Sequence, residues 1–218
     1  MVRPPMPVLS GAVTFARFRA EPASGRSDPK RWLSRGLARK AFQPLEVRKA
    51  ETDRSAGFVE LEDHDAVAFA VGAVFQGEHA LFSWRVDTLR VPASAVKAEL
   101  DKWAAAFAAE QGRPPAKREK AQRKDEVRQF LRQRATPTSR TFDVSWNLAT
   151  GEVAVWAASR KVVEEVAAEM EEAFAVKLAP ASASAGAVRA GIPEEALAPT
   201  SALFGDFGGR GEVARGKA

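Results

Sequence analysis

Residues 117–156 decide the fold and read KREKAQRKDEVRQFLRQRATPTSRTFDVSWNLATGEVAVW. The first part, residues 117–134, contains no proline or glycine and has the residue types of a helix. The segments TFDVSWNL and EVAVW, separated by ATG, predict a strand, a turn and a second strand. A long helix that leads into a β-hairpin indicates an α+β protein.

The positive charge of the chain is concentrated in this helix. Residues 113–134 hold nine Lys or Arg and three Asp or Glu, and nine minus three gives +6, whereas the whole chain nets +5. Only Val127, Phe130 and Leu131 can anchor the helix, because its first half has no apolar face. We therefore predict one long basic helix that projects into solvent. A basic excess focused in one element indicates an anionic partner.

Upstream of this helix, apolar spacing predicts further strands. Four segments have a strand-like composition, and the last two flank QGEH as a hairpin: residues 12–20, 58–62, 66–75 and 80–91. In the first strand, Val13 and Phe15 are expected on one face, and Phe18 falls out of phase.

Three further helices and one further strand are predicted around these. One helix spans residues 29–40 and carries Arg31, Arg35 and Arg39 in a row, a pattern that is usually a solvated face. A second spans residues 92–111 with an apolar stripe that we expect to be buried: Val96, Leu100, Trp103 and Phe107. A third spans residues 160–174, capped by Ser159, with its own stripe: Val163, Val166, Met170 and Phe174. Residues 175–178 are predicted as a last strand.

The fold class predicted is α+β, with antiparallel β-hairpins packed against helices. Three parts are expected along the chain. Residues 1–112 form an N-terminal α+β unit, residues 113–180 form the basic helix with a hairpin–helix unit, and residues 181–218 form a flexible linker and tail. One helical turn is expected at residues 192–197.

Composition and motifs do not point to catalysis. The chain has no cysteine and two histidines, His64 and His79, which excludes disulfides, Cys-based zinc sites and a His-rich metal site. No nucleophile elbow, Walker loop or zinc-protease motif is present. The segment EDHD around His64 is an acidic loop in the simplest interpretation, and the glycines of 205–211 belong to a tail. We expect a cytoplasmic protein without cofactor, metal or enzymatic activity.

Two kinds of anionic partner remain open from the residues alone. Lys and Arg spread along helices can neutralise DNA phosphates without reading bases. Alternatively, the basic helix docks on an acidic protein, and Trp84 or Trp146 supplies an exposed anchor.

The chain also resembles the RdgC family of recombination-associated proteins between Val13 and Pro180. The resemblance rests on the order and spacing of three anchors: Ala41-Phe42-Gln43-Pro44 after the opening strand–helix unit; Leu89-Arg90-Val91-Pro92 with the later Lys124-Asp125-Glu126-Val127 and Arg134-Ala135; and Trp146…Gly151-Glu152-Val153…Ala158-Ser159. Two features depart from the family pattern. Thr136 stands where the family has an aromatic residue, and family members continue with a large C-terminal part.

The resemblance implies a non-enzymatic, nucleoid-associated protein that binds duplex DNA regardless of sequence. It further implies a ring-shaped homodimer and a functional link to the RecA recombinase. Charge and position, rather than known family contacts, indicate the DNA-binding residues: Lys117, Arg118, Lys120, Arg123, Lys124, Arg128, Arg132, Arg134 and Arg140.

Overall fold

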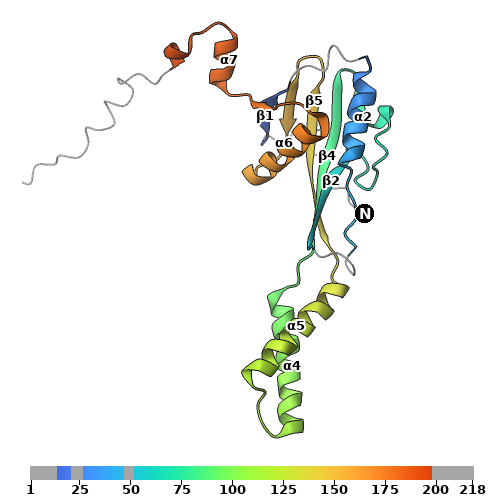
Figure 1. Ribbon diagram of the computed structural model, residues 1–218, viewed down its shortest axis with the longest axis vertical. Coiled ribbons are helices and arrows are strands. Elements are labelled where there is room, and N and C mark those ends of the chain that lie inside the picture. The colour runs from blue at the N-terminus through green and yellow to red at the C-terminus, as the bar shows by residue number, and fades with distance from the viewer. Residues whose placement is uncertain (1–13, 21–26, 47–51, 198–218) are drawn as a thin grey trace, which may run out of the picture. The chain divides into compact units, whose positions relative to one another are not determined.

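The computed structural model describes residues 14–20, 27–46 and 52–197 (Figure 1). The chain divides into two compact units, Met1–Leu178 and Ala179–Ala218. The first unit contains an antiparallel sheet with helices, so the predicted α+β class is confirmed.

The sheet of the first unit is built from hairpins and long-range pairs. Its strands are β1 (Ala16–Arg19), β2 (Arg54–Glu60), β3 (Phe75–Gln76), β4 (His79–Thr88), β5 (Thr138–Asn147) and β6 (Glu152–Val155). They lie in the order β2-β4-β5-β6-β1, with β3 paired to β4, and each pair is antiparallel. The predicted hairpin of residues 141–156 is the β5–β6 pair.

Two helices pack on one face of this sheet. The helix α2 (Pro29–Arg39) begins as predicted, because the Asp28 carboxylate accepts a hydrogen bond from the Arg31 N–H at 2.9 Å and Pro29 follows the cap. The helix α6 (Arg160–Phe174) buries the predicted stripe that runs from Val163 to Phe174. Ser159 is its N-cap residue but makes no side-chain capping hydrogen bond.

The core lies between these helices and the sheet. Phe174 of α6 packs against Trp146 of β5 and Phe58 of β2, with ring centroids 5.2 and 6.3 Å away. Trp84 and Trp146 are almost fully buried, so the prediction that either supplies an exposed anchor is wrong. Large aromatic side chains on the core face of paired strands are drawn into the interior by their apolar area.

Two strand predictions near the N-terminus are corrected by the pairing. Val13 lies outside the described residues, but Phe18 packs against the core and Phe15 is exposed beside Trp156. The in-phase residues of β1 are therefore Ala16 and Phe18, because these share the face of Val155 and Val153 in β6.

The predicted hairpin of residues 66–75 with 80–91 is wrong in its first arm. Residues 71–74 form the short helix α3 (Val71–Val74), and only Phe75 and Gln76 pair with β4. The long partner of β4 is β2, which begins at Arg54, four residues before the predicted start. Phe58 opposite Trp84 supplies an aromatic cross-strand pair for this register.

A helical hairpin emerges where β4 ends and β5 begins. The helix α4 (Ala93–Gln111) ends at Gly112, whose positive φ of 64° suits glycine, and α5 (Lys117–Arg134) packs against it (Figure 1). The basic helix therefore projects together with α4. The α4 stripe is only partly covered, since Val96 is buried whereas Trp103 and Phe107 are half-buried, which corrects the prediction of a buried stripe.

The second unit contains β7 (Ala179–Pro180), α7 (Ala183–Arg189) and the short 3-10 helix η1 (Glu194–Leu197). The run predicted as a flexible linker thus forms a helix, because the Ser182 hydroxyl accepts a hydrogen bond from the Ala185 N–H at 3.1 Å. Residues 175–178 do not form the predicted strand. Ala175 takes a left-handed φ of 49° after α6. The tail glycines of residues 205–211 lie outside the described residues.

The boundary predicted at residue 112 falls between α4 and α5. The strands on its two sides, β4 and β5, pair along their whole length. None of the helices within the described part of the chain is long and apolar enough to span a membrane.

Gly57 lets the chain after α2 approach the sheet. A Cβ at Gly57 would lie 2.4 Å from the Phe42 Cα, where the Phe42 N–H donates to the Phe58 carbonyl at 2.9 Å. We expect Gly57→Ala to lower the free energy of unfolding by about 3 kcal/mol, because backbone atoms must move to relieve the overlap. Denaturant unfolding measures this loss.

Gly72→Ala is the matched control, since its Cβ would meet nothing within 4 Å. In the helix α3, alanine is expected to be neutral or to stabilise the protein by up to about 1 kcal/mol. Equal stability of the two variants would contradict the close approach at Gly57.

Candidate nucleic-acid interface

The helix α5 is held in place by both of its ends. At its start, Glu119 accepts hydrogen bonds from the Ala116 N–H at 2.6 Å and from the Arg113 guanidinium at 2.8 Å. At its end, the Arg132 side chain donates to the Asp53 carboxylate at 2.7 Å, next to β2. Between these points Val127 is buried at 6% exposure, while Phe130 is 49% exposed. The predicted anchor is therefore confirmed for Val127 and wrong for Phe130.

Five of the nine predicted DNA-binding residues are exposed cations on α5. No ion pair to any of them is found within the described ranges: Lys117, Arg118, Lys120, Lys124 and Arg128. Residues at helical spacings of three and four share a face. Lys117, Lys120, Lys124 and Arg128 therefore form one ridge, which we call the α5 ridge.

The other four predicted residues are engaged elsewhere or lie off the helix. Arg123 pairs with Glu126 at 2.9 Å, and Arg132 is only 15% exposed in its pair with Asp53. The Arg134 guanidinium stacks over the Phe130 ring at 3.8 Å, which explains how this aromatic side chain stays partly covered at the surface. Arg140 lies on β5, outside the helical hairpin.

A groove runs between α4 and the α5 ridge. It has a volume of about 420 Å³. Its apolar side chains come from α4 and the segment before it, including Val96 and Leu100, and its rim carries Lys97, Lys120 and Lys124. The groove thus combines an apolar floor with a mainly cationic edge, and Asp101 is the one carboxylate among its lining residues. We call it the α4–α5 groove.

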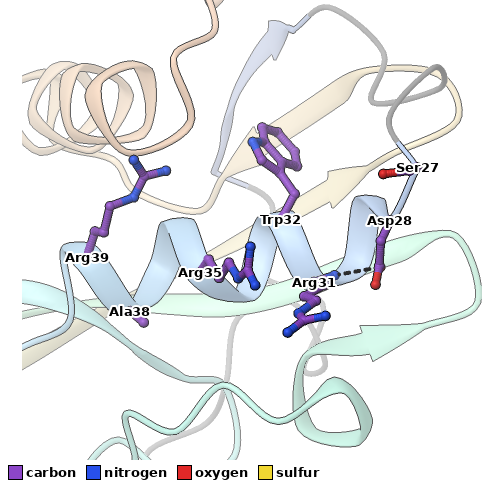
Figure 2. Close-up of a pocket in the computed structure, with 7 residues that line it drawn as sticks. All are labelled: Ser27, Asp28, Arg31, Trp32, Arg35, Ala38 and Arg39. Atoms are coloured by element: carbon purple, nitrogen blue, oxygen red, sulfur yellow. Dashed lines mark hydrogen bonds between the residues drawn. The ribbon is translucent and has the colours of Figure 1, made fainter.

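The arginine row of α2 lines a second concave surface, shown in Figure 2. Arg31, Arg35 and Arg39 border a cavity of about 990 Å³ together with Trp32. Arg39 is partly committed, because its guanidinium donates to the Ala173 carbonyl at 2.7 Å and ties α2 to α6. This row is a second basic surface, separate from α5 in the chain.

The acidic segment around His64 is tied to the sheet by Arg85. The Arg85 guanidinium pairs with Asp65 and with Asp87, and it donates to the His64 carbonyl at 2.9 Å. These contacts raise the pKa of Arg85, chiefly through its hydrogen bond to Asp87. Within the described residues, no group of three or more His, Asp or Glu side chains is placed to hold a metal ion.

The fold brings together cations that sequence reasoning missed. Arg54, Arg90 and Lys161 come from distant segments and line one cavity with Arg140. Arg54 faces Thr88 across the β2–β4 pair, and Thr88 faces Thr138 across the β4–β5 pair. Within each strand, the sequence shows which side chains share a face, because successive side chains alternate between the two faces. That alternation identifies this cluster of cations only when the register between the strands is also known.

The start of α5 carries a carboxylate with a strongly lowered pKa. Hydrogen bonds from Arg113 and then from the Ala116 N–H hold the pKa of Glu119 at about 2. A lowered pKa means that the folded protein favours the ionised form of Glu119 more than the unfolded chain does. The ionised carboxylate therefore stabilises the fold at pH values above its ordinary pKa near 4.5. This stabilisation is lost as the pH falls towards 2.

We expect Arg113→Gln to raise the pKa of Glu119 towards its ordinary value, because both hydrogen bonds from the Arg113 guanidinium are removed and only the one from the Ala116 N–H remains. A carboxyl NMR titration measures this pKa. Arg118→Gln is the control, since Arg118 has the same charge one residue away from Glu119. A midpoint near 4.5 in the unmodified protein would contradict the pairing.

The family model described as "Putative exonuclease, RdgC" matches residues 18–188. No curated protein matches the chain. The matched region runs from β1 to α7 and includes α4, α5 and the sheet.

Proposed function

Because this chain belongs to the RdgC family, we propose that it binds double-stranded DNA without sequence preference and does not cleave it. The observation that carries the proposal is the α5 ridge with Arg118 beside it. These cations are exposed, and none of them forms an ion pair within the described residues. A DNA duplex supplies the counter-charge that they lack.

The geometry of the ridge suits a phosphate backbone. From Lys117 to Arg128 the ridge extends about 16 Å along the helix, at about 1.5 Å per residue. Lysine and arginine on flexible stems reach phosphate oxygens without entering a groove, so the contacts carry no sequence information. Three further cations of α5 are partly engaged within the protein: Arg123, Arg132 and Arg134. They would strengthen the positive electrostatic field around the ridge without contacting the phosphates directly.

We extend the proposal to the recombination setting of the family. Binding to any duplex would place the protein on the nucleoid, where it would limit the access of the RecA recombinase to DNA. A homodimer would present two α5 ridges to one duplex and raise its effective affinity through the second contact.

Measuring duplex affinity across salt concentrations tests the core of this proposal. Two unrelated duplexes of equal length should bind with similar affinity, and log K should fall linearly with log salt. The DNA should be recovered intact after incubation with Mg²⁺ or Mn²⁺. Absence of duplex binding at low salt would refute the binding, and metal-dependent loss of terminal nucleotides would refute the non-enzymatic part.

A second candidate function is favoured by the α4–α5 groove. DNA phosphates need the cationic rim but not an apolar floor of Val96 and Leu100. An acidic amphipathic segment of a protein would use both, with carboxylates on Lys120 and Lys124 and apolar side chains on the floor.

Leu100→Glu separates the two candidates. It places a negative charge on the floor of the groove and leaves the cations of the α5 ridge in place. An acidic amphipathic peptide that displaces DNA from the parent should fail to do so in this variant. If the parent binds duplex DNA and no acidic amphipathic peptide displaces that DNA, the protein-partner function is excluded.

A further inference from the structure

We propose that the cavity where α6 meets the end of the sheet at Thr88 and Thr138 is a binding site for a phosphoryl group. It has a volume of about 550 Å³ and lies among β2, β4, β5 and α6, outside the α4–α5 hairpin. Its four cations come from four separate segments of the chain: Arg54, Arg90, Arg140 and Lys161. We call it the sheet-end cavity.

The cavity results from a change of chemistry along one face of the sheet. In the rows of the core face, Phe58, Trp84 and Phe142 lie side by side across three strands. Two residues further along β4 and β5, Val86 faces Arg140, and two further again Thr88 faces Thr138. The face that buries aromatic side chains in its centre therefore becomes basic and hydroxyl-bearing at its end.

The charges in this cavity are not balanced. Glu165 is the one carboxylate among the lining residues, and the Arg54 side chain donates to both of its oxygens, at 2.5 and 2.7 Å. Four cations against one carboxylate leave +3. For Arg90, Arg140 and Lys161, no ion pair is found in the described part of the chain.

A tetrahedral dianion is the ligand that this arrangement suits best. Convergent cations on separate elements surround a phosphoryl group, and arginine donates to its oxygens in a planar fork. The Thr88 and Thr138 hydroxyls can donate further hydrogen bonds to the same oxygens. Phe142 and Val162, both half-buried, supply apolar walls beside these exposed cations.

The phosphoryl group could come from the backbone of DNA or from a free phosphorylated molecule. The cavity has room for more than one phosphoryl group, since ligand sites of about 300–1,000 Å³ hold whole small molecules. The inference does not rest on the α5 ridge, because its residues do not line this cavity.

The test is calorimetric titration of the full chain with inorganic pyrophosphate, without divalent metal. The variant is Arg90→Gln with Lys161→Gln, two residues outside the proposed α5 contacts. Arg17→Gln with Lys177→Gln is the control, since it removes the same two kinds of charge from exposed positions elsewhere. We expect the parent and control to bind pyrophosphate and the cavity variant to lose tenfold or more in affinity.

Measuring duplex binding by the same variants shows whether the phosphoryl group belongs to DNA or to a free phosphorylated molecule. If pyrophosphate displaces DNA and the cavity variant weakens both ligands, the site holds a backbone phosphate. If only pyrophosphate binding falls, the site serves a free phosphorylated molecule. The inference is overturned if the parent does not bind pyrophosphate at low salt, or if the cavity variant binds it as tightly as the control. DNA binding that fails while pyrophosphate binding persists would refute the proposed function alone.

Discussion

Replacing Lys117, Arg118, Lys120 and Lys124 with glutamine is expected to flatten the salt dependence of duplex binding by up to about 3.6 units of slope. Each phosphate contact contributes about 0.9 to the slope of log K against log salt on B-DNA. These four cations are exposed and have no ion pair within the described residues, so their charge is available to phosphates. Affinity should fall alike on unrelated duplexes, because backbone contacts do not read sequence.

The control removes the same net charge elsewhere, with Arg17, Arg19, Lys177 and Arg189 changed to glutamine. It should keep most of the slope, because general electrostatic attraction falls off over about 10 Å at 0.1 M salt. Thermal stability of the α5 variant should barely change, since none of its four side chains is buried. If the two variants lose affinity equally, α5 is not the contact surface, and the arginine row of α2 in Figure 2 becomes the next candidate.

Trp146→Ala is expected to lower the free energy of unfolding by about 3–5 kcal/mol, the range for truncating a buried large aromatic side chain. Trp146 has 0% exposure and packs against Trp32 and Phe174, with ring centroids 5.6 and 5.2 Å away. Its loss would open a cavity between the sheet and both covering helices. Chemical denaturation followed by circular dichroism measures the change.

Trp103→Ala is the control because it removes the same side chain from α4. Trp103 is half-buried and stacks on Phe107 at 5.3 Å, so a loss of about 1 kcal/mol is expected from its smaller buried area. A small effect at Trp146 would place this residue outside the core. It would also restore the interpretation of Trp146 as a binding anchor.

Local sequence patterns were sufficient for the elements whose signals lie within one segment. The basic helix spans Lys117–Arg134 in the structure, as its uninterrupted composition predicts. The helix α2 begins at Pro29, the predicted first residue, and the stripe from Val163 to Phe174 defined the buried side of α6. Each of these signals depends only on residues within a few turns of the chain.

Local patterns failed where an apolar segment had more than one available partner. Residues 66–75 have a strand-like composition, but β4 pairs along most of its length with β2, whose Phe58 packs on Trp84. The α4 stripe has helical periodicity, yet α5 offers only Val127 as a buried apolar partner, so Trp103 and Phe107 stay half-exposed. Periodicity gives the apolar side of an element and not what covers it.

The sequence by itself determined that this protein carries a basic helix and an α+β framework, because charge and periodicity are properties of contiguous residues. Tertiary structure decided which cations are free. It paired Arg132 with Asp53 and stacked Arg134 on Phe130, but left Lys120 and Lys124 exposed. It also brought Arg90, Arg140 and Lys161 to one cavity. The physical reason is that strand register and helix packing join segments far apart in the chain, and the charge around a side chain depends on those neighbours.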